Sequence, residues 1–226
     1  MVRGITILLV GLAILGTYRA QVRIDTIRSE MPAAVALMDL PEADLLKAVS
    51  LGYGQLVADL LWLRTIQVVG DRGVSCCYRW IYRAIDTVTT LDPTFAFAYQ
   101  FGGLLLSTVG EPLELSEALL EKGERANPDV WQLPFYRGYN VSVYRKDPAR
   151  AAAHVARAAR LPGRPDNLPE FAARLYEQSG SREAALDFLG TMIEETEDET
   201  MRELLEERVQ QIREAGQDAL SPPESP

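Results

Sequence analysis

Cysteine and histidine are scarce in this chain, which limits the chemistry that its side chains can support. The 226 residues include only two cysteines, Cys76 and Cys77, and one histidine, His154. Adjacent cysteines cannot link distant parts of a fold, so no disulfide framework is available. Their sulfur atoms would point about 100° apart on a helix, and no second cysteine pair or histidine cluster completes a zinc site. We therefore expect structural thiols, with a vicinal disulfide or redox role as the alternative, and no bound metal or cofactor.

The common catalytic and phosphate-binding motifs are also missing. The sequence contains no HExxH, GxSxG, GxxxxGK[ST] or GxGxxG pattern, and the cysteine pair lacks the CxxCH spacing of haem attachment. His154 lies in the middle of a predicted helix with no visible partner for acid–base catalysis. The sequence therefore predicts a protein that is not an enzyme and has no small-molecule substrate, with a surface or packing role for His154.

The chain has no excess of basic residues. It contains 32 Asp and Glu against 23 Lys and Arg, for a net charge of −9. A nucleic-acid-binding protein needs a concentrated basic face to neutralise phosphates, so we predict no nucleic-acid partner. Residues 145–164 are locally basic, and we consider three roles for them: a partner site, a surface facing anionic lipid headgroups, or a solvated face paired with an acidic helix. The basic residues of this segment are Arg145, Lys146, Arg150, Arg157, Arg160 and Arg164.

One apolar run, residues 4–18 (GITILLVGLAILGTY), lies between Arg3 and Arg19. Fifteen residues of helix rise about 22 Å, against about 30 Å for a bilayer core. Neither an A-x-A cleavage pattern nor a lipobox cysteine follows the run. We predict that residues 1–20 form an uncleaved transmembrane anchor that contacts membrane lipid through residues 4–18, a removed signal peptide being the alternative.

The flanking charges bear on the orientation of this anchor. Arg3 and the amino terminus compete with Arg19, Arg23 and Arg28 on the other flank, and the positive-inside rule counts both. A single N-terminal anchor with a basic start usually behaves as an uncut export signal. Basic residues are mostly Arg, which is typical of GC-rich bacterial genomes. We therefore predict a single-pass protein of the bacterial inner membrane with a periplasmic body.

Strand patterns are nearly absent, whereas apolar residues recur at helical spacing from about residue 42 to 212. Pro and Gly divide this region into segments. The pattern predicts an all-α fold with helices near 42–50, 53–69, 75–90, 94–108, 113–125, 130–145, 148–160, 168–179, 182–195 and 198–214. The predicted organisation is an anchor (1–20), a helical neck (21–52), a solenoid of helical hairpins with a C-terminal capping helix (53–214) and a disordered tail (215–226).

A period of about 35 residues separates Pro93, Pro128 and Pro162, which indicates a helical repeat. Small and large residues recur at matching places in three segments. Residues 92–128 carry Tyr99, Gly103, Gly110, Leu120 and Pro128; residues 137–162 carry Gly138, Asp147, Ala151, Val155 and Ala158; residues 171–190 carry Ala173, Tyr176, Gly180, Ala185 and Leu189. This pattern resembles the tetratricopeptide (TPR) repeat, and the whole layout resembles membrane-anchored bacterial TPR proteins. It departs from the repeat at Pro134, Ser116 and Gly123.

The resemblance implies that the first helix of each repeat lines a concave groove that binds a protein. Carried over to this chain, the groove positions are Phe97, Gln100 and Leu104, then Gln132, Phe135, Tyr139 and Ser142, continued by Asn167, Glu170, Arg174 and Glu177, with Arg145 and Lys146 as a basic flank. Aromatic anchors among polar groups suit recognition of a peptide or helix. The alternative for Phe135 and Tyr139 is internal packing. We expect a non-catalytic scaffold that holds a protein partner at the membrane, and we expect this partner to be part of a membrane-associated complex. The alternative function is an integral accessory subunit of an energy-transducing, pilus or secretion assembly.

Overall fold

The structure of the protein is a computed structural model, and it describes residues 11, 13–23, 40–70, 78–108 and 113–218. All regular structure in these ranges is helical, which confirms the predicted all-α class. Residues 13–23 are helical, and no helix of the described residues is long and apolar enough to cross a membrane. Most of the predicted anchor (residues 1–10 and 12), half of the predicted neck (24–39), Cys76, Cys77 and Gly110 lie outside the described residues.

The helices follow the predicted segments closely. In chain order they are α3 (Ala43–Val49), α4 (Gly54–Gly70), α5 (Tyr78–Leu91), α6 (Ala96–Thr108), α7 (Leu113–Ala126), α8 (Gln132–Asn140), α9 (Pro148–Ala159), α10 (Leu168–Gln178), α11 (Arg182–Glu195) and α12 (Glu199–Asp218).

Local sequence explains several of the helix ends. Asp147 accepts a 3.0 Å hydrogen bond from the backbone N–H of Arg150, and Pro148 supplies the first residue of α9. Asp198 caps α12 in the same way through the backbone N–H of Thr200. Gly180 follows α10 with a φ of +79°, a conformation that glycine adopts without strain. The Asp-Pro and Gly breaks in the sequence therefore act as helix boundaries.

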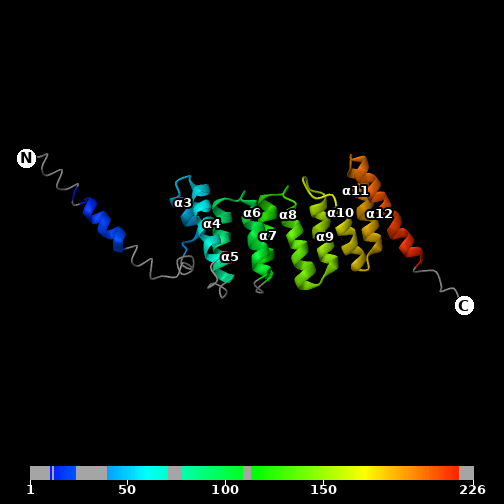
Figure 1. Ribbon diagram of the computed structural model, residues 1–226, viewed down its shortest axis with the longest axis horizontal. Coiled ribbons are helices and arrows are strands. Elements are labelled where there is room, and N and C mark those ends of the chain that lie inside the picture. The colour runs from blue at the N-terminus through cyan, green and yellow to red at the C-terminus, as the bar shows by residue number, and fades with distance from the viewer. Residues whose placement is uncertain (1–10, 12, 24–39, 71–77, 109–112, 219–226) are drawn as a thin grey trace, which may run out of the picture.

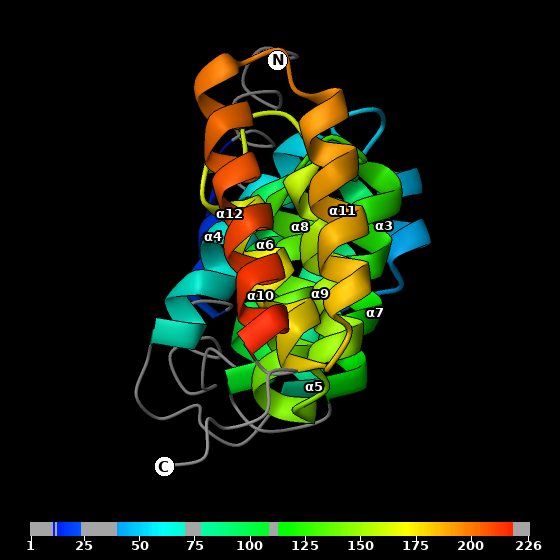
Figure 2. The same ribbon diagram turned by 90° about the vertical axis from the view of Figure 1, so that its right-hand side faces the viewer.

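The helices stand side by side in a row in chain order, with α3 and α4 at one end and α12 at the other (Figure 1). From α4 to α12, each helix contacts the next. Second neighbours also touch, in the pairs α3–α5, α5–α7, α6–α8 and α10–α12. Figure 2 looks along the row, with α4 and α12 on one side of it and α3 and α7 on the other. Alternate helices therefore belong to two layers.

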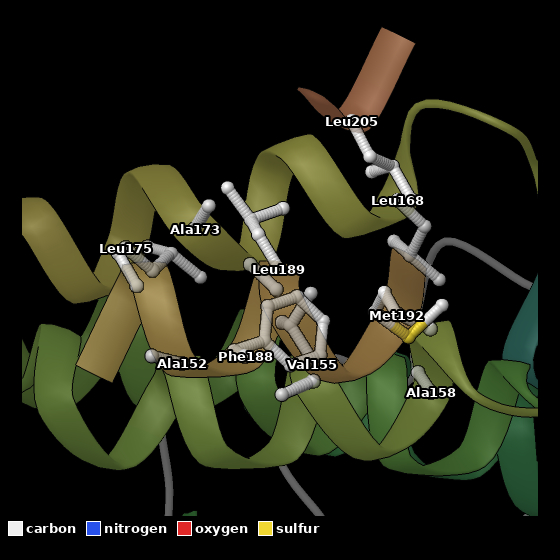
Figure 3. Close-up of a cluster of buried hydrophobic side chains, with 14 of the residues drawn as sticks. Ala152, Val155, Ala158, Leu168, Ala173, Leu175, Phe188, Leu189, Met192 and Leu205 are labelled. Atoms are coloured by element: carbon white, nitrogen blue, oxygen red, sulfur yellow. The ribbon is translucent and has the colours of Figure 1, made fainter. Parts of the chain in front are cut away.

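The apolar core consists of two clusters that meet at α8. The first joins α4 to α8 and includes Trp62, Ile85, Tyr99 and Leu133. The second joins α8 to α12, where Val155, Leu168, Phe188, Leu189, Met192 and Leu205 converge from four helices (Figure 3). Apolar side chains are therefore buried between successive helices, and no single central core exists in the described residues.

Small residues face large ones where paired helices cross. A Cβ atom at Gly103 would lie 2.5 Å from the Leu120 side chain, and one at Gly138 would lie 2.7 Å from Val155. Leu120 and Val155 are fully buried. These contacts join α6 to α7 and α8 to α9, so glycine lets the helix backbones approach while the large partner fills the space.

The structure corrects three of the predicted segments. The helix expected at 130–145 is α8 followed by a π-helical turn, Val141–Arg145, which ends at Lys146 with a φ of +53°. Helix α12 runs to Asp218, past the start of the tail expected from 215, and Gly216 is buried against Arg182; residues 219–226 lie outside the described residues. Within the range expected for the neck, α3 contacts α5 and Leu46 packs on the core.

Candidate partner-binding surface

The three predicted groove residues of α6 lie along one helix. Phe97 is 57% exposed, Leu104 is 38% exposed and Gln100 is half-buried. The Phe97 ring packs edge-on against Trp62 of α4, with ring centroids 5.9 Å apart. Phe97 and Leu104 are therefore apolar side chains in contact with solvent, and the first of them rests on a buried aromatic ring that fixes its position.

The predicted residues of α8 and of the π-helical turn after it divide between packing and exposure. Phe135 is half-buried and contacts Trp131, Tyr136 and Phe171 at ring-centroid distances of 5.7, 5.5 and 6.4 Å. Tyr139 is 37% exposed. Gln132 and Ser142 are half-buried. Phe135 thus has a packing role between α8 and α10, whereas Tyr139 keeps a face open to solvent.

Most of the predicted basic residues are paired with acidic ones. Arg145 Nε donates a 2.9 Å hydrogen bond to Glu117 Oε1, and Nη2 lies 3.3 Å from Glu114. The hydrogen bond and charge of Glu117 raise the pKa of the Arg145 guanidinium. Arg174 pairs with Glu170 of its own helix at 2.7 Å. Within the described residues, Lys146 has no carboxylate within 4.0 Å, and it remains exposed at the turn before α9.

The structure brings together a charged cluster that the sequence did not predict. Glu124 of α7 is 3% exposed and accepts hydrogen bonds from Arg137 of α8 at 3.2 Å and Arg157 of α9 at 2.8 Å. Burial, with the charges of Arg137 and Arg150, lowers the pKa of the nearby His154 to about 4. His154 is therefore neutral at pH 7. One carboxylate joins three successive helices, and no sequence spacing signals this.

A second buried polar contact joins α6, α7 and α8. Asn140 Nδ2 donates to Ser116 Oγ at 2.9 Å, and Ser116 Oγ donates to the backbone carbonyl of Gly103 at 2.6 Å. Asn140 is fully buried, and its Oδ1 has no hydrogen-bond partner in the described residues. The only signal in the sequence was the departure of Ser116 from the repeat pattern.

Two clefts lie near the C-terminal end of the row. One, of about 330 Å³, separates the start of α10 from α12 and is lined by Asn167, Glu170, Leu204, Glu207 and Arg208 among others. The other, of about 510 Å³, lies between the segment 159–166 and the α11–α12 junction, where Arg160 and Arg164 face Glu195, Glu197 and Asp198. Asn167 and Glu170, both predicted groove positions, therefore border a real cleft.

A large exposed apolar surface lies at the opposite end, on the hairpin formed by α3 and α4. Its members are Leu45, Val49, Leu51, Tyr53, Leu56, Leu60 and Leu63, each more than half exposed. We call these residues the hairpin patch. Leu45, Val49 and Leu51 fall in the predicted neck and the other four in the predicted solenoid, and their exposure was not predicted, because apolar spacing on a helix does not show whether another helix covers it.

Groups that could bind a metal ion are not assembled in the part of the chain that the structure describes. No three His, Cys, Asp or Glu side chains there are placed around a common point. Comparison with known proteins found no matching protein-family model and no matching curated protein.

Proposed function

We propose that this protein is a non-catalytic, membrane-anchored scaffold whose TPR-like helical solenoid holds a protein partner near the bilayer. The observation that carries the proposal is the exposure of Phe97 and Leu104 on one helix of a row of paired helices. Exposed aromatic side chains that rest on a rigid scaffold are favourable anchors for a protein partner.

The packing of small residues against large ones supports the TPR-like character. Gly103 faces Leu120, Gly123 faces Tyr99 and Gly138 faces Val155, each pair joining two antiparallel neighbours. Helical repeats bury their faces against adjacent units in this way. The anchor part of the proposal depends on the apolar residues 4–18 and on the absence of a cleavage pattern after them.

A second candidate is a permanent subunit of a larger membrane assembly, which would use the hairpin patch as a protein interface. Obligate interfaces are more apolar than transient ones, and an exposed apolar patch of this kind marks an interaction surface. The two candidates differ in how long the partner stays bound. A permanent subunit would stay in a complex of fixed stoichiometry through detergent extraction and size-exclusion chromatography, whereas a scaffold would release its partner on dilution.

The test is crosslinking in intact membranes, followed by purification and mass spectrometry. Wild-type protein is compared with the double variant Phe97→Ala/Leu104→Ala and with Glu183→Ala, an exposed control on α11. We expect the double variant to lose most of its crosslinked partner while its helical content stays unchanged, since a hot-spot side chain contributes about 2 kcal/mol or more.

Two outcomes would contradict the proposal. If the folded double variant captures its partner undiminished, the recognition surface is not on α6. If mature chains begin near Gln21 in amino-terminal sequencing, residues 1–20 do not anchor the protein.

A further inference from the structure

The turn between α3 and α4 holds two apolar side chains away from the protein. Leu51 is 85% exposed and Tyr53 is 69% exposed. Leu51 has a φ of +50°, in the left-handed region that a leucine rarely adopts, and Gly52 follows with a φ of +93°. A strained turn whose apolar side chain contacts almost nothing in its own protein is a candidate for an external contact.

The turn is fixed in this shape by hydrogen bonds at its base. Ser50 Oγ donates to the Lys47 carbonyl at 2.7 Å, and the Tyr53 N–H donates to the Ser50 carbonyl at 2.8 Å. Gly54 lies close to the end of α5, where an added Cβ would stand 3.2 Å from the Leu91 carbonyl oxygen. Leu51 and Tyr53 therefore project from a supported turn.

The rest of the hairpin patch lies on the two helices that flank this turn. On α4, Leu56, Leu60 and Leu63 recur at spacings of four and three residues, which places them on one face, with Asp59 and Arg64 exposed beside them. On α3, Leu45 and Val49 are exposed, whereas Leu46 packs on the core and Arg83 donates to the Leu40 carbonyl at 2.7 Å. The hairpin is thus held from one side and apolar on the other.

From these observations we infer that the hairpin patch docks on the bilayer, with Leu51 and Tyr53 inserted at the membrane interface. The inference rests on the membrane anchor of the proposed function. Chain length supports it: residues 24–39 connect the helical segment 13–23 to residue 40, and a chain of that length spans at most about 60 Å even when fully extended. An anchored chain therefore keeps residue 40 within about 60 Å of the helical segment 13–23, so the hairpin can reach the membrane surface.

The shape and chemistry of the patch favour lipid over a protein occupant. A projecting turn flanked by two apolar helix faces fits a fluid surface, which adapts to any relief. The two clefts described above are formed by residues 159–211 at the other end of the row, so neither adjoins the patch. Tyrosine is typical of the membrane interface, and Lys47 beside the turn can extend its ammonium group towards the headgroups.

The test uses the full-length protein reconstituted in neutral phosphatidylcholine vesicles. Leu51→Cys, in a Cys76→Ser/Cys77→Ser background, carries an environment-sensitive NBD label, and Glu183→Cys on α11 carries the same label as control. Interfacial residues lie about 5–10 Å deep, so we expect about a twofold loss of NBD emission at position 51 when the lipids carry a shallow doxyl quencher, and none at position 183. High salt should leave the quenching unchanged, because the patch is apolar.

A second label, placed at another position of the patch, tests the docking through substitutions. In chains labelled at Leu60→Cys, the changes Leu51→Asp and Leu56→Asp should abolish lipid quenching while the protein still floats with the vesicles. Vesicle flotation separates the two proposals. If the chains float but iodide in the water quenches the label at position 51, the docking is wrong and the anchor stands. The same holds if a second copy of the chain shields that label from both lipid and water. If the chains fail to float, the anchor and the docking are both wrong.

Discussion

The backbone of Gly123 on α7 lies directly against the ring of Tyr99 on α6, so that a Cβ atom at position 123 would stand 2.8 Å from Tyr99 Cγ. Tyr99 is fully buried, and its hydroxyl donates a 3.2 Å hydrogen bond to the carbonyl of Thr89. The ring therefore has no room to move aside. This contact sets the distance between α6 and α7.

We predict that Gly123→Ala lowers the free energy of unfolding by about 1–3 kcal/mol, because the added methyl group overpacks a rigid contact. Urea denaturation followed by circular dichroism measures it. Gly190→Ala is the matched control, since Gly190 lies inside α11 with no atom within 4 Å of a Cβ. It should be neutral or stabilise by up to about 1 kcal/mol through helix propensity. Equal effects of the two substitutions would show that the close approach to Tyr99 is unimportant.

Glu124 provides a second test, because it is a buried carboxylate between two guanidinium groups. Glu124→Gln keeps the shape but removes the buried carboxylate that pairs with Arg137, whose side chain is 18% exposed and keeps only Glu121, at 3.7 Å. Removing one partner of a buried pair typically destabilises by about 3–5 kcal/mol, and partial exposure of Arg157 places this case at about 2–3 kcal/mol. Thermal unfolding measures the loss. Glu183→Gln, at an exposed position of α11, is the control and should change stability by less than about 1 kcal/mol.

The lowered pKa of His154 predicts a pH dependence of stability. The folded pKa is about 4 and the unfolded value about 6.5, so the unfolded chain binds a proton first as pH falls. Stability from this residue is therefore present above about pH 6.5 and is lost as pH falls towards 4, by at most about 1.4 kcal/mol per pH unit. His154→Gln should flatten the stability profile in that window in urea titrations at several pH values. If the pH dependence of stability is the same in the variant as in the wild type, a group other than His154 titrates in this range.

Phe135 and Phe97 should respond differently to truncation. Phe135 packs among three aromatic rings, so Phe135→Ala should lower the free energy of unfolding by about 2 kcal/mol. Phe97→Ala should cost less than about 1 kcal/mol, since that side chain is 57% exposed. Denaturation midpoints of the two variants provide the comparison. A larger loss at position 97 would mean that this ring belongs to the core, and it would then be unsuited to binding a partner.

Local sequence patterns predicted most of the helices. The apolar period and the Asp-Pro and Gly breaks identified the elements from α3 to α12 within a few residues, because helix capping and chain reversal depend on neighbours in the chain. The pairing of small with large residues, such as Gly103 with Leu120, was also visible in the repeat pattern.

Exposure and long-range charge pairing depended on the tertiary structure. Periodicity marks an apolar face without showing what covers it, so it did not distinguish the half-buried Phe135 from the exposed Phe97, or predict that Leu56, Leu60 and Leu63 face outward. Likewise, Glu124 meets Arg137 and Arg157 only because α7, α8 and α9 pack together, which brings residues 13 and 33 positions apart within hydrogen-bonding distance. The sequence by itself determined the helices and their order, whereas the burial of each face and the partners of each charge were decided by how those helices pack.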